Sequence, residues 1–273
     1  MPDISIPSLF NVKGKIGTRR RRMIAEGFVR NGATVYIAAR KEQQLKDAVH
    51  DMKQLAPAGG GVHYVVADVS SKAGCDTLIS EFKKREATLH VLVNNSGLGW
   101  SGPFDDFPEA KGWDYVFNVN VKSVFYMTAG LSDYLSQGST ALDPGRVLNI
   151  SSIASVQPAN VDVMSKPEHG VWSYGPSKSA VNHLTSQLAV KLAPKFVTVN
   201  AILPGFFPNK ATAGLTKFLA EVAESQPMGR VGATPDIAGL ALFLASPAGA
   251  HVTGQRIIID GGLSLFDFQR SKM

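Results

Sequence analysis

The stretch GKIGTRRRRMIAEGFVRNGATVYIAAR, residues 14–40, contains a helical pattern followed by a strand pattern. Its middle part, Met23 to Arg30, has the apolar spacing of a helix, and residues 33–39 form a nearly continuous apolar run rich in β-branched side chains. Such a run is typical of a strand that is buried on both faces of a parallel sheet. The stretch therefore predicts part of a β–α–β unit.

The same alternation continues along the whole chain. Strands are predicted at 33–39, 62–67, 89–93, 146–150, 196–202 and 256–259, and helices at 23–30, 41–55, 72–85, 113–135, 173–192, 212–224 and 235–244. This order predicts an α/β fold with a doubly wound, mostly parallel, Rossmann-like sheet. Because no linker, repeat or low-complexity tract interrupts the pattern, residues 1–273 are expected to form a single domain.

Composition narrows the class of protein. With 44% hydrophobic and 18% charged residues, the chain is typical of a globular protein with a full core. The single cysteine, Cys75, excludes an intramolecular disulfide and suits a reducing, intracellular compartment. Neither a membrane span nor a signal peptide is predicted. The net charge of +6 is concentrated around Lys13, Lys15 and Arg19–Arg22, and the six histidines lack metal-site spacing, so we expect neither nucleic acid nor metal as a partner.

Tyr174 and Lys178 are the first candidates for chemistry. They are four residues apart at the beginning of the predicted helix 173–192, so they share one helix face. A lysine ammonium near a phenol favours the phenolate, which would let Tyr174 donate and accept a proton near neutral pH. By itself, this spacing is also typical of a surface pair on an amphipathic helix.

Several other strands end in short polar or glycine-containing tips, and one helix carries a similar polar motif. These segments are Asn94–Gly97, Asn149–Ser152, Pro204–Gly205 and Asp260–Gly262 at strand ends, and Asn118–Lys122 within the helix 113–135. The carboxyl ends of parallel strands meet at one edge of the sheet, where α/β proteins bind ligands. We therefore expect these tips and Tyr174 to form one site.

In combination, these motifs resemble those of the classical short-chain dehydrogenases/reductases, which interconvert alcohols and ketones with NAD(P)(H). The resemblance covers about residues 23–262 and is strongest to fungal members named after 3-oxoacyl-[acyl-carrier-protein] reductases. It implies that Ser152 hydrogen-bonds the substrate oxygen and that Tyr174 exchanges a proton with it. It further implies that Lys178 binds the nicotinamide ribose and that Asn120 holds a water of a proton relay. A homodimer or homotetramer, paired through the helices near Trp113 and Ser173, is also implied.

The expected cofactor-binding residues follow from the same resemblance. They are Arg40, Asp68, Asn95, Lys122, Tyr174, Lys178, Pro204, Gly205 and Phe207. The tip of the second strand, Ala38–Lys41, contains an arginine and a lysine but no acidic residue. An acidic residue there would bind the ribose 2′-hydroxyl of NAD, whereas an arginine can neutralise the 2′-phosphate of NADP. We therefore favour NADP(H), although Arg40 could instead begin a solvated helix.

Two features depart from the family pattern. Ser152 and Tyr174 are 22 residues apart, which is wider than usual, so residues 153–170 should border the substrate pocket. The apolar first strand and glycine-rich phosphate loop are replaced by Gly14–Thr18 and four arginines, a shortening of about six residues. We expect residues 9–12 to act as a substitute first strand, and cofactor affinity and stability to be low. A misassembled coding region would also explain the gap.

The loops expected around the substrate, 98–104, 153–170 and 206–215, are rich in aromatic and apolar residues, which favours a medium or large apolar ketone or an acyl chain. Three functions remain open: an NADP(H)-dependent reductase, a cofactor-defective partner subunit, and a basic patch at Arg19–Arg22 for nucleic acid or nuclear import. The chain ends in Ser271-Lys-Met273, which resembles the Ser-Lys-Leu peroxisomal signal. We expect a cytoplasmic protein, with the peroxisome as the alternative compartment.

Overall fold

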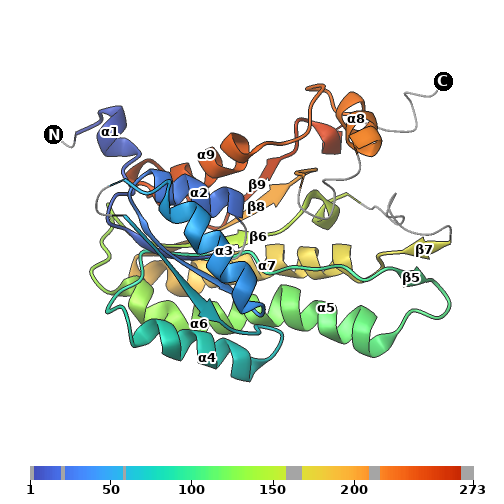
Figure 1. Cartoon of the computed structure of the whole chain (residues 1–273), viewed down its shortest axis with the longest axis horizontal. Coiled ribbons are helices and arrows are strands. Elements are labelled where there is room, and N and C mark those ends of the chain that lie inside the picture. Colours follow the sequence, from blue (N-terminus) through green and yellow to red (C-terminus); the bar gives the residue numbers. More distant parts are fainter. Residues whose placement is uncertain (1–2, 20–21, 58–59, 158–167, 209–215, 266–273) are drawn as a thin grey trace.

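The computed structural model describes residues 3–19, 22–57, 60–157, 168–208 and 216–265. A seven-stranded parallel sheet forms its centre (Figure 1), in the order β3-β2-β1-β4-β6-β8-β9. The strands are β1 (Ile16–Arg19), β2 (Thr34–Ala39), β3 (Gly61–Val66), β4 (Val91–Asn94), β6 (Gly145–Ile150), β8 (Val197–Pro204) and β9 (Arg256–Ile259). The strand order reverses between β1 and β4, which is where doubly wound sheets bind ligands.

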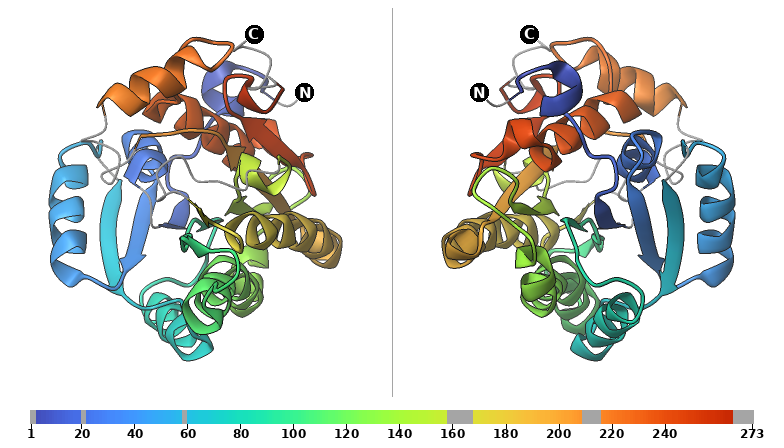
Figure 2. Two further views of the ribbon diagram at one scale, coloured as in Figure 1. Left: turned by 90° about the vertical axis from the view of Figure 1, so that its right-hand side faces the viewer. Right: turned by 90° about the vertical axis from the view of Figure 1, so that its left-hand side faces the viewer.

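Helices cover both faces of the sheet (Figure 2). One face carries α2 (Arg22–Arg30), α3 (Glu42–Lys53) and α9 (Thr234–Ala245), and the other carries α4 (Lys72–Lys83), α6 (Ser123–Ser136) and α7 (Tyr174–Leu192). Each face has its own cluster of buried apolar side chains. The remaining α-helices are the short α1 (Ile6–Leu9) and α5 (Tyr115–Phe117), and α8 (Thr216–Glu224). None of the helices in the described parts of the chain has the length and apolarity to cross a membrane.

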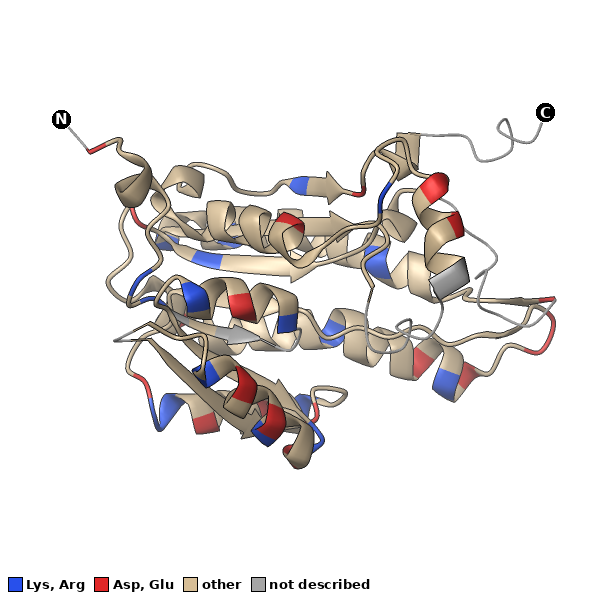
Figure 3. Ribbon diagram, turned by 45° about the horizontal axis from the view of Figure 1, so that its top comes forward, with Lys and Arg blue, Asp and Glu red and all other residues tan. Residues whose placement is uncertain are grey.

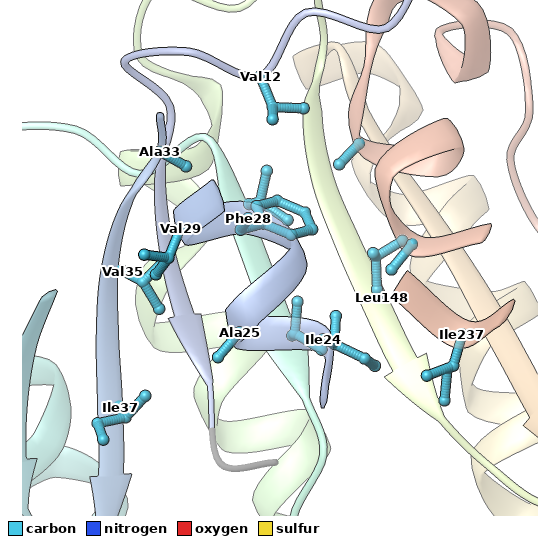
Figure 4. Packing of buried hydrophobic residues seen from close by; sticks show 14 of the residues in the cluster. Val12, Ile24, Ala25, Phe28, Val29, Ala33, Val35, Ile37, Leu148 and Ile237 are labelled. Atoms are coloured by element: carbon cyan, nitrogen blue, oxygen red, sulfur yellow. The ribbon is translucent and has the colours of Figure 1, made fainter. Parts of the chain in front are cut away.

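The first strand differs from the sequence-based expectation. Residues 6–9 form helix α1, so the prediction that residues 9–12 replace the strand is wrong. The strand is Ile16–Arg19, which pairs over all four residues with β2 and at Gly17 and Thr18 with β4. Val12 is nevertheless buried, and Figure 4 shows it beside the cluster formed by Phe28 and its neighbours. A central strand is thus retained, although it is shorter than the six-residue β2.

The other predicted elements are confirmed to within a few residues at their ends, and the beginning of the predicted helix 212–224 lies outside the described residues. A second, two-stranded antiparallel sheet was not predicted. It consists of β5 (Gly102–Pro103) and β7 (His169–Gly170), and it joins the loop after β4 to the segment before Tyr174. Acidic and basic residues alternate along several surface helices (Figure 3), as on an ordinary solvated surface.

Candidate active site

The predicted catalytic residues converge at the carboxyl edge of the sheet. Ser152, Tyr174 and Lys178 line one pocket of about 160 Å³. The tips of three strands complete it, contributing Asn95 and Gly97 after β4, Ile150 and Ser151 at β6, and Pro204, Gly205, Phe206 and Phe207 after β8. These strand tips therefore share one pocket with Tyr174, whereas Asp260 and Gly261, which were expected in the same site, line a separate pocket.

Lys178 is held beside Tyr174 in a buried position. Its side chain is 4% exposed, and Nζ lies 5.8 Å from the centre of the Tyr174 ring. Nζ also donates a 2.8 Å hydrogen bond to the carbonyl of Ile150, at the end of β6. A Cβ atom on Gly97 would come within 3.0 Å of Nζ, so a glycine at this position leaves the ammonium room. The buried ammonium can therefore stabilise negative charge on the phenol.

Asn120 locks the loop after β4 onto helix α7. It is fully buried within Asn118–Lys122, a π-helical segment between α5 and α6. Its amide nitrogen donates 2.9 Å bonds to the carbonyl of Leu98 and the hydroxyl of Ser177, and its oxygen accepts from the Leu98 amide. Ser177 lies one turn after Tyr174, so Asn120 fixes both the loop and the helix that carries the tyrosine.

Ser152 presents its hydroxyl at the edge of the same pocket. Its backbone is extended, with φ −167°, and its Oγ accepts a 3.2 Å bond from the amide of Ala154, at the beginning of a short 3₁₀ helix. The hydroxyl proton can then be donated to a ligand. The neighbouring Ser151 hydroxyl donates to the carbonyl of Lys178, which ties the end of β6 to α7.

A buried polar ladder supports these residues from behind. Asn94 donates to the hydroxyl of Thr128 and to Asn149 Oδ1, and Asn149 donates in turn to the hydroxyl of Thr185, over distances of 2.9–3.1 Å. The ladder links β4, β6, α6 and α7. Satisfied buried networks of this kind make a site rigid. Sequence analysis missed Thr128, Ser177 and Thr185, since a buried hydroxyl in an apolar helix gives no signal of its own.

Comparison with known proteins identifies the family to which the chain belongs. A family profile described as "Enoyl-(Acyl carrier protein) reductase" matches residues 22–264. The rhamnolipid-biosynthesis 3-oxoacyl-[acyl-carrier-protein] reductase of Pseudomonas aeruginosa is 36% identical over 247 residues, which cover 89% of this chain and 91% of that protein. The chain belongs to the short-chain dehydrogenase/reductase family.

Two further relatives extend the comparison. The short-chain dehydrogenase/reductase PhomF of the fungus Diaporthe leptostromiformis is 27% identical, over 96% of this chain and 95% of its own length. The solved Pseudomonas aeruginosa RhlG/NADP active-site complex superposes with a TM-score of 0.82 at 35% identity, over 94% of this chain and 98% of that one. The chain is thus a short-chain dehydrogenase/reductase oxidoreductase with relatives that bind NADP.

A second pocket lies at the tips of β2, β3 and β4, where members of this family would bind the adenosine half of the cofactor. Arg40, Asp68 and Asn95 are among its lining residues, with Ser123 and Met127 of α6. Asn95 lines both pockets, and its buried Nδ2 has no hydrogen-bond partner within the described part of the chain. A buried donor without a partner is costly. A polar group of a ligand could satisfy this donor.

The stretch between β1 and α2 fits the cofactor less well. The strand ends at Arg19 and the helix begins at Arg22, while residues 20 and 21 lie outside the described part. The sequence has no glycine between Gly17 and Gly27, whereas a glycine-rich turn is what brings backbone amides close to a pyrophosphate in nucleotide-binding folds. Arg22 is engaged elsewhere, with 2.5 Å and 2.8 Å contacts to Glu26 and Asp51 that hold its pKa above the usual value.

Of the other predicted cofactor residues, three lie in the catalytic pocket and one lies outside both pockets. Pro204, Gly205 and Phe207 line the catalytic pocket, as expected from the resemblance. Lys122 is exposed on the π-helical segment and is not among the described residues that line either pocket. The structure therefore brings together every predicted catalytic residue and most of the predicted cofactor residues.

Proposed function

We propose that this short-chain dehydrogenase/reductase interconverts a ketone and a secondary alcohol with NADP(H), using Tyr174 to transfer the proton. The observation that carries the proposal is the convergence of Ser152, Tyr174 and Lys178 on one pocket, with Asn120 fixed behind them. When bound, the nicotinamide of the cofactor supplies or accepts the hydride.

The residues of the chain perform the remaining steps. In reduction, Ser152 donates a hydrogen bond to the carbonyl oxygen, and the Tyr174 hydroxyl gives its proton to that oxygen as it becomes an alcohol. The Lys178 ammonium stabilises the phenolate that remains and would bind the nicotinamide ribose. Asn120, whose amide is already bonded to the Leu98 backbone, would hold the water that returns a proton to Tyr174.

NADP(H) is proposed over NAD(H) because Arg40 stands directly after β2, where an acidic residue would favour NAD. The residues proposed to hold the adenosine half are Arg40, Asp68 and Asn95, and those for the nicotinamide half are Tyr174, Lys178, Pro204, Gly205 and Phe207, with Lys122 as a weaker candidate. The RhlG/NADP complex supports this choice of cofactor by resemblance.

A medium or large apolar ketone or an acyl chain is proposed as the substrate. Phe206 and Phe207 line the pocket, and Phe206 packs edge-on against Phe218 of α8, with ring centres 5.4 Å apart. Phe104 and Trp172 form a second aromatic pair on the opposite loops. We propose that these aromatic side chains contact the apolar part of the substrate, while the polar residues of the pocket, Ser152, Tyr174 and Lys178, face its carbonyl group. We also propose that the chain is most similar to fungal members of the family, such as PhomF.

We further propose that the phosphate loop is shortened and that cofactor affinity is correspondingly low. The two-residue connection between β1 and α2 supports this, as does a family match that begins at residue 22. The same observation favours a second candidate function, a cofactor-defective partner subunit. Sequencing the transcript across codons 15 to 23 tests whether the shortening arises from an error in assembling the coding region.

The experiment that tests the function compares the chain with a repaired variant. An apolar strand and glycine-rich loop inserted between Ile16 and Met23 should raise NADPH affinity and the rate of reduction of a panel of apolar ketones. In the repaired variant, Tyr174→Phe should lower kcat by at least about a hundredfold, while NADPH affinity stays nearly constant. Normal turnover by that Tyr174→Phe variant would refute the assignment, and no binding or turnover even after repair would favour the partner-subunit alternative.

Assembly and compartment are proposed from the resemblance and the sequence. We propose a homodimer or homotetramer, which sedimentation would test. A cytoplasmic location is proposed, with the peroxisome as alternative because of Ser271–Met273, which lies outside the described residues. A fluorescent fusion with a free C-terminus should be punctate if the signal is used, and deleting the three residues should then make it diffuse.

A further inference from the structure

Arg40, which lines the adenosine pocket, is bonded to a residue of another element. Its Nη1 donates a 2.8 Å hydrogen bond to the hydroxyl of Tyr115, which lies 75 residues further along the chain in α5. Arg40 stands at the tip of β2, and the helical run that contains Tyr115 contributes Ser123 and Met127 to the lining of the same pocket. Tyr115 is not one of the described lining residues, so it contacts the guanidinium from beside the pocket.

We propose that Tyr115 is a positioning residue that holds Arg40 for the 2′-phosphate of NADP(H) and so contributes to the choice of NADP(H) over NAD(H). The inference rests on the proposed function for the identity of the cofactor. The side chain of Arg40 is 51% exposed, so without a partner it would sample many rotamers. Fixing it before the ligand arrives reduces the entropy lost on binding.

A phenol hydroxyl suits this positioning role better than a second carboxylate beside Arg40 would. Asp68 also approaches Arg40, but its Oδ2 lies 3.8 Å from Nη1 and its side chain is 47% exposed. Such a loose, solvated ion pair is weak and is readily exchanged for a phosphate, which carries up to about two negative charges. An uncharged phenol orients the guanidinium without repelling the phosphate. Its hydroxyl accepts from Arg40 and has its own proton to donate to a phosphate oxygen.

A purely structural role is the alternative reading of the bond. In that case the hydroxyl only fastens α5 to the end of β2, and its loss lowers stability without changing which ligand is preferred. Comparing the affinities of two ligands that differ only in the position of the phosphate distinguishes the two roles.

The test uses adenosine 2′-monophosphate and adenosine 5′-monophosphate as probes, titrated by NMR into the full chain at low salt. The isomers have the same base and charge, and neither needs a complete pyrophosphate loop. We expect the wild-type chain to prefer the 2′ isomer, and Tyr115→Phe to lower that preference at least about fivefold, equivalent to about 1 kcal/mol. Tyr64→Phe is the matched control. It also removes a phenol hydroxyl that is bonded to a surface side chain, but that hydroxyl donates to Glu42 at 3.0 Å and not to Arg40, so the preference should stay within about twofold.

Arg40→Met shows whether Tyr115 acts through the arginine. Arg40→Met should remove most of the preference, and adding Tyr115→Phe to it should change nothing further. The inference is overturned if the wild-type chain does not prefer the 2′ isomer, if Tyr115→Phe leaves the preference unchanged, or if its effect persists in the Arg40→Met background.

The outcome is separable from that of the proposed function. If the 2′ preference depends on Tyr115 while NADPH supports no ketone reduction even after loop repair, the proposed function fails and the inference stands. If NADPH supports reduction but Tyr115→Phe leaves the preference unchanged, only the inference fails.

Discussion

Replacing Lys178 by methionine removes the ammonium from the active site while keeping most of the side chain's volume. Nζ lies 5.8 Å from the centre of the Tyr174 ring. At an effective dielectric constant of about 20, an ammonium within several ångströms of a phenolate stabilises it by roughly 2–4 kcal/mol. Loss of that stabilisation corresponds to about a hundredfold decrease in kcat. Lys178→Met should therefore cost about as much as Tyr174→Phe.

The two variants should also be non-additive, because the pair acts as a unit. Kinetics at saturating NADPH measure this when both single variants and the double variant are made in the chain with the repaired phosphate loop. The carbonyl of Ile150 loses its 2.8 Å bond in Lys178→Met, so the free energy of unfolding should fall by about 1–3 kcal/mol. Unchanged binding of adenosine 2′-monophosphate serves as the control for folding. A Lys178→Met enzyme that keeps kcat within a few fold would refute the reasoning.

Two further predictions concern stability and the substrate loops. Burial tends to raise the pKa of Asp143, but hydrogen bonds from Lys15 and the fully buried Arg146 outweigh it and hold the pKa below its usual value. Its contribution to stability is therefore present above about pH 4 and lost as pH falls through the lowered value. In urea unfolding, Asp143→Asn should lower the free energy of unfolding by roughly 0.5–1 kcal/mol at pH 7, because the Asp143 side chain is 54% exposed and solvent screens its charge, and the difference from the wild type should shrink at pH 3. Trp172→Phe removes the 3.1 Å hydrogen bond from the indole to the carbonyl of Gly102. The KM for an apolar ketone should then rise with little change in kcat. An unchanged KM would argue against a substrate role for β5 and β7.

Much of the fold could be predicted because its signals are local. Each buried strand, such as Val91–Asn94, is a short apolar run, and each covering helix has its own periodicity. The catalytic residues were found for a related reason, since Tyr174 and Lys178 are one turn apart and the strand tips of a parallel sheet must share an edge.

What could not be predicted depends on contacts between distant segments. The sequence alone does not decide between residues 9–12 and the stretch after Gly14 as first strand, because pairing with β2 and β4 selects Ile16–Arg19. The β5–β7 pair has only two residues in each strand, which is too short for any periodicity. Tyr115 gives no signal on its own, because its partner Arg40 is 75 residues away.

We propose that the chain keeps the catalytic and 2′-phosphate ends of an NADP site but has lost most of its contacts to the pyrophosphate. Calorimetric titration of the unaltered chain with NADPH and with NADH tests it most directly. Losing two or three charge-assisted backbone bonds and the helix-terminus contribution costs about 3–7 kcal/mol, so we predict NADPH binding weaker than about 100 µM, yet tighter than that of NADH. Low-micromolar affinity for NADPH, or equal affinity for the two cofactors, would contradict the claim.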